Sequence, residues 1–223
     1  MMRGVDPQAV IFDLDGVLIE SEQVWDEVRR GLATGAGRPW PPETTTALQG
    51  MSTGEWSRYL VEVVGVPGLP EDVAAEVIRR VAGRYRDGLP LLPGAVDTIR
   101  ALAGRWPLGV ASSSPVTLIR LVLATAGVAD LFGAAVSSEE VPRGKPAPDV
   151  YLEAAARLGV EPSRCVAVED SSNGLRAAVA AGMVLVAAPN VEYPPAAEAL
   201  ALATAVVPGV AAVTAELIAS LPG

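Results

Sequence analysis

The stretch QAVIFDLDG, from Gln8 to Gly16, decides the fold of this chain. Its first half, QAVIF, is a short apolar run, and a run of this length that ends at a polar loop is typical of a buried β-strand. Its second half places Asp13 and Asp15 directly after that strand. We therefore expect two carboxylates at the carboxyl end of a buried strand.

Further runs of the same kind follow, with helical patterns among them. The runs are Pro107 to Ala111, Gly133 to Val136, Cys165 to Val168, Met183 to Ala188 and Thr204 to Val207. The stretches with helical periodicity are Gly94 to Arg105, Pro115 to Ala126, Asp149 to Leu158 and Ser172 to Ala181. Strands that alternate with helices form a parallel sheet that is covered on both faces. The sequence thus predicts an α/β fold with a Rossmann-like parallel sheet.

The connection after Gly16 is far longer than a strand–helix crossover requires. Up to about Leu89 it contains no strand-like run, only four amphipathic stretches: Ser21 to Thr34, Pro42 to Gln49, Gly54 to Val64 and Glu71 to Arg86. We interpret these stretches as a helical domain inserted into the α/β core. The expected boundaries are 1–16 and 90–223 for the core domain and 17–89 for the inserted domain.

Composition narrows the classes of function. The chain of 223 residues has a formal net charge of −9, which argues against nucleic-acid and anionic-membrane partners. No apolar run approaches the length of a membrane span, and the first residues lack the layout of a signal peptide. The single cysteine, Cys165, excludes an intrachain disulfide and suits a reducing compartment. We expect a cytoplasmic protein that does not associate with membranes and, by default, a monomer.

Polar side chains follow several of the expected strands. In open parallel sheets ligands bind beyond the carboxyl ends of the strands, so these side chains should meet at one edge. They are Asp13, Asp15, Ser112, Ser113, Lys145, Glu169 and Asp170. Such a set supplies a carboxylate nucleophile, oxygen ligands for Mg²⁺ and donors for phosphoryl oxygens. The pattern favours phosphoryl transfer from a small phosphorylated substrate.

Lys145 is the most informative cation. The chain has 17 lysines and arginines, and Lys145 is the only lysine among them. A compact ammonium has thus been kept at the place where a phosphate and carboxylates would meet, and the planar guanidinium of arginine does not substitute freely for it there. Arg143, two residues away, is interpreted as a surface charge.

Four motifs carry a resemblance to a known family. In chain order they are FDLDGVL, VASSS, GKPAPDVY and VEDSSNG, which begin at Phe12, Val110, Gly144 and Val168. They resemble the motifs of the haloacid dehalogenase-like (HAD) phosphohydrolases, in the branch that contains β-phosphoglucomutase and the sugar-phosphate and phosphoglycolate phosphatases. The resemblance covers nearly the whole chain, and it implies that the inserted helices form a cap domain.

The resemblance implies a role for each aspartate of the first motif. Asp13 would attack phosphorus and form an aspartyl-phosphate. Asp15 would protonate the leaving alkoxide and then take a proton from the hydrolytic water. The chain has no histidine, so a carboxylic acid must perform this proton transfer.

The resemblance also implies a magnesium site and phosphate contacts. Asp13, the backbone carbonyl of Asp15 and Asp170 would hold Mg²⁺, and Glu169 would ligate it directly, ligate it through water or hold Lys145. Ser112 would donate its hydroxyl to a phosphoryl oxygen. Ser113 and Ser114 have two interpretations, phosphate binding or capping of the helix that begins at Pro115. Asn173 and Gly174 are expected to shape the loop and the start of the next helix.

The expected cap narrows the reaction but does not name the substrate. Mutases of this branch carry a histidine and an arginine at the positions that align with Trp25 and Thr53, so a phosphatase is favoured over a phosphomutase. A non-catalytic phosphate-binding protein is the alternative outside the enzymes; the presence of Asp13 and Lys145 argues against it. Pocket-facing or structural roles are both open for six residues of the cap: Trp25, Gln49, Thr53, Glu55, Trp56 and Arg58.

Overall fold

The computed structural model describes residues 7–48, 51–191 and 193–221 of the chain. Two compact units make up the protein: Met1–Glu20 with Pro90–Gly223, and Ser21–Leu89. We call the first the core unit and the second the helical unit. The division falls at Ser21, four residues beyond the start at 17 that the sequence suggests.

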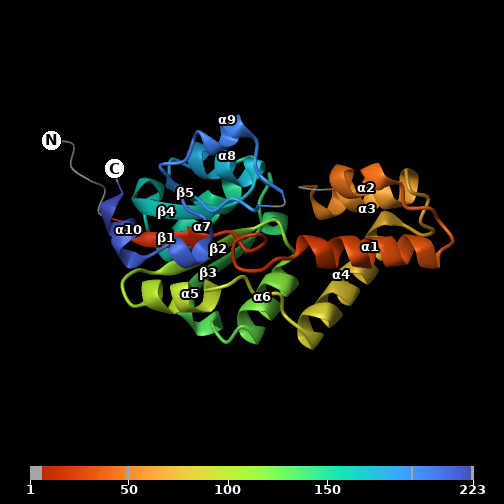
Figure 1. Ribbon diagram of the computed structural model, residues 1–223, viewed down its shortest axis with the longest axis horizontal. Helices are drawn as coiled ribbons and strands as arrows, with labels where there is room; N and C mark the ends of the chain where they lie inside the picture. The colour runs from red at the N-terminus through yellow and green to blue at the C-terminus, as the bar shows by residue number, and fades with distance from the viewer. Residues whose placement is uncertain (1–6, 49–50, 192, 222–223) are drawn as a thin grey trace. The chain divides into compact units, whose positions relative to one another are not determined.

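The core unit is built on a parallel sheet of six strands in the order β3-β2-β1-β4-β5-β6 (Figure 1). The strands are β1 (Ala9–Phe12), β2 (Leu108–Ser112), β3 (Phe132–Ser137), β4 (Cys165–Glu169), β5 (Val184–Ala187) and β6 (Ala205–Val206). Each corresponds to one of the expected apolar runs. The predicted α/β fold with a Rossmann-like parallel sheet is therefore confirmed.

Strand β1 lies between β2 and β4 in the interior of the sheet, and every one of its residues is apolar and buried. Phe12 pairs with Val110 of β2 on one side and with Val168 of β4 on the other. The chain therefore runs outward from β1 to β3 and then crosses back to β4. This reversal of strand order is where open α/β sheets bind their ligands.

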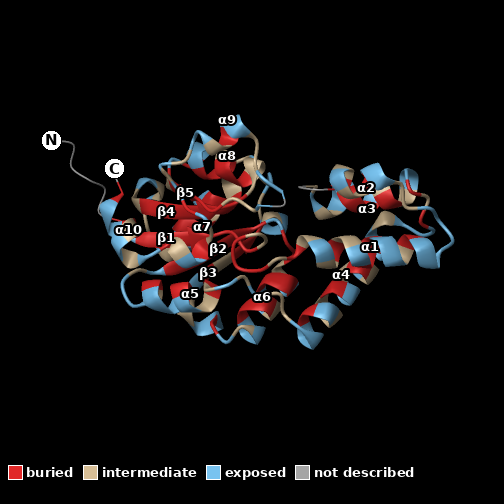
Figure 2. Cartoon of the chain, in the orientation of Figure 1, coloured by how far each residue is buried: buried red, intermediate tan, exposed pale blue. Residues whose placement is uncertain are grey.

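Helices cover both faces of the sheet, with α5 and α6 on one side and α8 and α9 on the other (Figure 1). The core-unit helices are α5 (Ala95–Ala103), α6 (Val116–Thr125), α7 (Asp149–Leu158), α8 (Ser172–Ala180), α9 (Ala197–Leu200) and α10 (Ala215–Ser220). Short 3-10 turns lie at Ala129–Leu131, Ser138–Glu140, Pro162–Arg164 and Val210–Ala212. The buried strands between these layers are seen in Figure 2.

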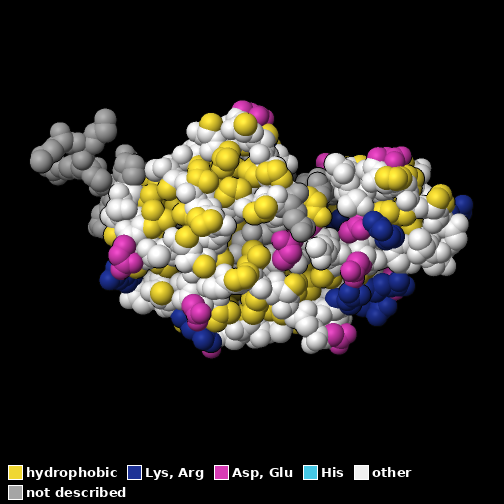
Figure 3. Space-filling model, in the orientation of Figure 1, with side chains coloured by type: hydrophobic (Ala, Val, Ile, Leu, Met, Phe, Trp, Pro, Cys, Tyr) yellow, Lys and Arg dark blue, Asp and Glu magenta, His cyan; other side chains and the backbone are white. Residues whose placement is uncertain are grey.

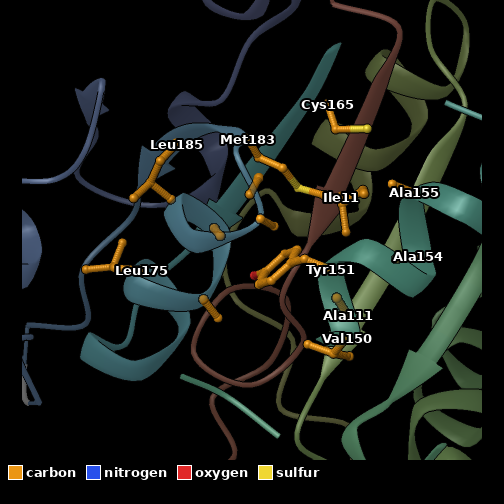
Figure 4. Close-up of a cluster of buried hydrophobic side chains, with 14 of the residues drawn as sticks. Ile11, Ala111, Val150, Tyr151, Ala154, Ala155, Cys165, Leu175, Met183 and Leu185 are labelled. Atoms are coloured by element: carbon orange, nitrogen blue, oxygen red, sulfur yellow. The ribbon is translucent and has the colours of Figure 1, made fainter. Parts of the chain in front are cut away.

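Small side chains let α7 and α8 pack closely on the sheet. Ala154 and Ala155 of α7 and Ala177 of α8 are fully buried, in one apolar cluster with Ile11 of β1. Figure 4 shows Tyr151 of α7 among the apolar side chains of this cluster. A phenol carries a polar hydroxyl, and such a group needs a hydrogen-bond partner when it is buried.

The helical unit consists of α1 (Glu22–Gly35), α2 (Pro42–Leu48), α3 (Thr53–Glu62) and α4 (Pro70–Asp87). Helix α3 begins at a capping box, in which the backbone N–H of Ser52 donates to Glu55 Oε2 at 2.8 Å. Helix α4 begins at Pro70, whose fixed φ suits a first helical position. Charged side chains of both signs lie on its exposed surface (Figure 3).

An aromatic pair forms the centre of the helical unit. The rings of Trp25 and Trp56 are both buried, with their centroids 5.9 Å apart. The guanidinium of Arg29 lies 4.8 Å from the first centroid and 4.9 Å from the second, which is cation–π distance. The two tryptophans thus pack against each other and Arg29. Gln49, also named from the sequence, lies outside the described residues.

In the described part of the chain, no helix is both long enough and apolar enough to cross a bilayer.

Candidate active site

The loop after β1 holds Asp13 and Asp15 at the sheet edge. The backbone N–H of Asp13 donates to Val168 O at 2.9 Å, so the hydrogen-bond ladder with β4 extends one residue beyond the strand. Gly16 follows in a left-handed conformation, with φ of +78°. A Cβ at Gly16 would lie 2.0 Å from Asp170 Oδ2, so glycine allows the β1 loop to approach the β4 loop.

Lys145 reaches the same edge from the loop before α7. Its ammonium nitrogen lies 3.0 Å from Asp13 Oδ1 and 2.5 Å from Glu169 Oε1, and only 4% of its side chain is exposed. Burial alone would lower the pKa of this lysine, but the carboxylates of Asp13 and Glu169 outweigh it and raise the pKa above its ordinary value. Lys145 is therefore held as a buried cation between two acids.

Glu169, at the end of β4, is fully buried and accepts hydrogen bonds on both oxygens. Oε1 accepts from Lys145 and from the hydroxyl of Tyr151 at 2.9 Å. Oε2 accepts from the backbone N–H groups of Asp170 and Ser171, at 3.0 and 3.1 Å, and from the Ser171 hydroxyl at 3.2 Å. Five donors thus fix this carboxylate, which a buried charge requires.

Gly174, in the first turn of α8, lies directly against Glu169. A Cβ at this position would come within 1.7 Å of Glu169 Oε1. The residue that the sequence assigned to shaping the loop thus leaves the space that the buried carboxylate occupies.

Three carboxylates gather around Lys145. Oxygens of Asp13, Glu169 and Asp170 lie within 4.8 Å of one another. Burial, and then the neighbouring Glu169, raise the pKa of Asp13 to about 8. The same causes raise the pKa of Asp170 well above its ordinary value. One ammonium is too little positive charge for three buried carboxylates, so the cluster favours a further cation.

The donor set fits a magnesium ion. Mg²⁺ prefers carboxylate and carbonyl oxygens, which are the ligands that this edge offers. Asp170 Oδ1 is buried and, within the described ranges, accepts no hydrogen bond. A buried carboxylate oxygen without a donor is costly unless a cation lies beside it. Asp13 and Asp170 are therefore the residues best arranged to hold the ion.

Two serines, one at the end of β2 and one in the loop that follows, contact Asp15. The hydroxyl of Ser114 donates to Asp15 Oδ2 at 2.7 Å, and the hydroxyl of Ser112 donates to the same oxygen at 3.2 Å. Helix α6 has Pro115 at its N-cap, and no side-chain hydrogen bond caps it. Ser114 thus bonds Asp15 and does not cap the helix. Ser113, between them, is exposed.

The site residues predicted from the sequence gather at one edge of the sheet, and each of them except Ser113 contacts at least one other. Those joined by hydrogen bonds, ion pairs or carboxylate contacts are Asp13, Asp15, Ser112, Lys145, Glu169 and Asp170. Ser113 lies in the same loop without a contact of this kind to them in the described structure. Arg143 is exposed and pairs with Asp149 at 2.7 Å, as expected of a surface charge.

The sequence left the role of Ser114 undecided between phosphate binding and helix capping, and it assigned no role to Tyr151. The signal for Tyr151 was its place in GKPAPDVY, six residues after Lys145. Its hydroxyl donates to Glu169, and its ring centroid lies 5.1 Å from the Lys145 nitrogen. It thus contacts two of the predicted site residues.

Known proteins are similar to this chain in sequence and in fold. The model of the haloacid dehalogenase-like hydrolases matches residues 7–182. The Hexitol phosphatase B of Escherichia coli is 37% identical over 195 residues, which cover 84% of this chain and 86% of that protein.

Two solved structures extend the likeness. CbbY from Rhodobacter sphaeroides, in complex with phosphate, has a TM-score of 0.81 at 27% identity and covers 95% of this chain and 96% of that one. The β-phosphoglucomutase of Clostridium difficile has a TM-score of 0.80 at 25% identity, with coverage of 95% of each chain.

These matches confirm the resemblance that the four motifs indicate, and with it the expected class, a phosphoric monoester hydrolase of the HAD type. The family model spans every site residue described above, from Asp13 to Gly174. The chain belongs to the haloacid dehalogenase-like hydrolase family.

Proposed function

We propose that this protein is a Mg²⁺-dependent phosphatase that hydrolyses a small phosphorylated metabolite, such as a sugar phosphate, through an aspartyl-phosphate on Asp13. The observation that carries the proposal is the contact of Asp13 with Lys145 at 3.0 Å, beside the carboxylates of Glu169 and Asp170. A nucleophilic carboxylate beside a buried cation and a metal-binding set is the arrangement that phosphoryl transfer requires.

Asp13 acts as the nucleophile. A carboxylate oxygen of Asp13 forms a bond to phosphorus while the bond between phosphorus and the ester oxygen of the substrate breaks. Asp15 gives its proton to that ester oxygen, so the product leaves as an alcohol. Asp15 lies two residues after Asp13 in the same loop, and its Oδ1 is buried without a hydrogen-bond donor in the described structure.

Hydrolysis of the aspartyl-phosphate restores the enzyme. Asp15, now ionised, takes a proton from a water molecule, and the water oxygen forms a bond to phosphorus. The bond between phosphorus and Asp13 breaks, which releases inorganic phosphate and returns Asp13 to its carboxylate form. Asp15 ends the cycle protonated, as it began.

Asp13, the backbone carbonyl of Asp15 and Asp170 would hold Mg²⁺. Glu169 would stand next to the ion and act through water, because both of its oxygens already accept hydrogen bonds. The ion would offset the repulsion between the phosphate and the carboxylates. The further duty of Glu169 is to hold Lys145.

The phosphoryl oxygens are bound by the remaining polar groups. Lys145 neutralises negative charge on the transferring group, and Ser112 donates its hydroxyl to one oxygen. Ser113 is exposed in the same loop, where a substrate phosphate can reach its hydroxyl. These are the phosphate-binding residues that we propose.

The relatives support a sugar or sugar-alcohol phosphate as the substrate class. One relative is named a hexitol phosphatase, and this chain covers 86% of it. We propose that the helical unit is the cap that selects the substrate. A location in the cytoplasm and a monomeric state stay predictions.

A phosphomutase is the second candidate, because a β-phosphoglucomutase has the same fold at 25% identity. This chain has Trp25 and Thr53 at the cap positions that align with a mutase histidine and arginine. Trp25 is buried against Trp56. A mutase that lacks both polar groups would not retain a phosphorylated intermediate, so hydrolysis is favoured.

A panel of phosphorylated metabolites tests the function. Hexose, hexitol and glycolate phosphates and p-nitrophenyl phosphate are incubated with Mg²⁺ or with EDTA, and released phosphate is measured. We expect hydrolysis with Mg²⁺ only. Phosphoryl retention in an isomeric product would instead support the mutase, and no turnover of any compound would contradict both.

Asp13→Asn gives the matching test of the nucleophile. The variant should fold normally and lose activity, whereas Asp130→Asn, at an exposed position of the core unit, should retain it. Appreciable activity of Asp13→Asn would contradict the assignment of Asp13.

A further inference from the structure

We infer that Ser114 is a positioning residue that holds the carboxylate of Asp15 so that its Oδ1 carries the proton of the reaction. The inference rests on the proposed function and adds a residue to it. The sequence allowed two interpretations of this serine, as a helix cap or as a phosphate contact. Its hydroxyl instead makes a hydrogen bond to the proposed acid/base at 2.7 Å.

The two oxygens of Asp15 have different surroundings. Oδ2 accepts both serine hydroxyls, from Ser114 at 2.7 Å and from Ser112 at 3.2 Å. Oδ1 is buried and accepts no hydrogen bond from the described residues. The carboxyl group is thus fixed through one oxygen while the other is left for a partner that is not part of the protein. An acid/base needs this arrangement, since only the free oxygen can exchange a proton with the substrate.

Ser112 cannot donate a hydrogen bond to Asp15 and to a phosphoryl oxygen at the same time. A hydroxyl has one proton to donate. When a phosphoryl oxygen binds, Ser112 donates that proton to it, and its hydrogen bond to Asp15 is lost. Ser114 then remains as the side-chain donor to Oδ2 among the described residues. Its importance to Asp15 therefore increases when the substrate is bound.

Ser114 is itself held by residues at the ends of two strands. Only 7% of its surface is exposed. Its backbone N–H donates to the Ser112 hydroxyl at 3.0 Å, and its carbonyl accepts from the hydroxyl of Ser137 at 2.8 Å. Ser137 ends β3 and is fully buried, next to Ser112 at the end of β2. The position of Ser114 is thus set by the ends of β2 and β3, elements of the rigid sheet.

The chemistry of the leaving group provides a readout that a merely structural role would not affect. An alkoxide is a poor leaving group, so its departure depends on a proton placed on the ester oxygen. The p-nitrophenolate ion leaves without such help. A misplaced Asp15 should therefore slow the cleavage of alkyl phosphates far more than that of p-nitrophenyl phosphate. The ratio kcat/KM reports substrate binding and formation of the aspartyl-phosphate, and it excludes the later hydrolysis of that intermediate.

Ser114→Ala is the test variant, with p-nitrophenyl phosphate and the alkyl phosphate of highest kcat/KM in the panel as substrates. We expect kcat/KM to fall about 10- to 100-fold for the alkyl phosphate. It should fall less than about threefold for p-nitrophenyl phosphate. Thr117→Ala removes an exposed hydroxyl three residues away and should change neither value.

The outcomes separate the two proposals. Equal losses for both substrates, or no loss for either, would contradict the positioning role while leaving the phosphatase intact. Absence of hydrolysis by the unaltered protein would contradict the proposed function itself. Thermal unfolding of Ser114→Ala checks that the variant is folded, and the ratio of the two kcat/KM values holds even if part of the protein is lost to misfolding.

Discussion

The ammonium of Lys145 lies 3.0 Å from Asp13 Oδ1, and both side chains are more than nine-tenths buried. Glu169 Oε1 lies 2.5 Å from the same nitrogen. The cation is therefore placed by two carboxylates, one of which we propose as the nucleophile. A point charge fits between them because a lysine nitrogen is compact and can donate in three directions.

Lys145→Arg should inactivate the enzyme although it keeps the charge. The planar guanidinium is larger than an ammonium and would have to fit beside Glu169, which is fully buried. We expect kcat/KM to fall by at least about 100-fold. Arg143→Lys is the matched control, since Arg143 is exposed two residues away, and it should stay within about threefold. A Lys145→Arg enzyme with normal activity would disprove the need for a compact cation.

Gly174→Ala should destabilise the core unit. The added Cβ would come within 1.7 Å of Glu169 Oε1, so either the start of α8 or the carboxylate must move. We expect a loss of about 1–3 kcal/mol in the free energy of unfolding. Urea denaturation measures it, with Gly31→Ala as control. No atom lies within 4 Å of a Cβ at Gly31, in the exposed part of α1, so that variant should be slightly more stable.

Tyr151→Phe should affect both stability and turnover. The variant removes the hydroxyl that donates to Glu169 Oε1 at 2.9 Å and leaves the ring in its apolar cluster. The loss of a hydrogen bond to a buried charge should lower the free energy of unfolding by about 1.5–3 kcal/mol. We expect kcat to fall about tenfold, because Lys145 is then held less firmly. Tyr59→Phe, on α3, removes a hydroxyl far from these residues in the chain and should change kcat little. An unchanged Tyr151→Phe enzyme would show that Lys145 needs no such support.

The sequence was sufficient to predict the parallel sheet and the polar residues that lie at its edge. The apolar run before Asp13 and the runs before Ser112 and Glu169 predict strands, and parallel strands present their carboxyl ends together. The order of the strands could not be read in this way. Nothing in the run before Asp13 indicates that β1 lies between β2 and β4.

The contacts within the site were less predictable, because they depend on side-chain direction. Ser114 precedes Pro115, and a serine before a helical proline has the pattern of a cap. The rotamer that reaches Asp15 depends on the neighbouring strand, which is distant in the chain. Tyr151 follows the apolar periodicity of α7 and therefore has the pattern of a core residue. The hydrogen bond of its hydroxyl to Glu169 is a tertiary contact between residues 18 positions apart.

Binding of Mg²⁺ should strengthen as the pH rises, because protons compete for the same carboxylates. Burial and Glu169 raise the pKa of Asp13 from 3.8 to about 8, so a proton competes with the ion for Asp13 near neutral pH. The pKa of Asp170 is raised as well, so affinity should increase with pH by up to about tenfold per pH unit for each proton that the ion displaces. Isothermal titration calorimetry in buffers of different ionisation enthalpy measures both the affinity and the proton released.

The same shift predicts how stability depends on pH. A folded-state pKa above the unfolded value means that protonated Asp13 stabilises the metal-free protein fully below about pH 4 and that this contribution is lost as the pH rises through about 8. With EDTA, the Tm should therefore contain a component that falls across this range, and the gain from Mg²⁺ should be largest at its upper end. In Asp13→Asn the position cannot ionise, so this component should be absent. If the gain from Mg²⁺ were the same at all pH values, competition between the ion and the Asp13 proton would be disproved.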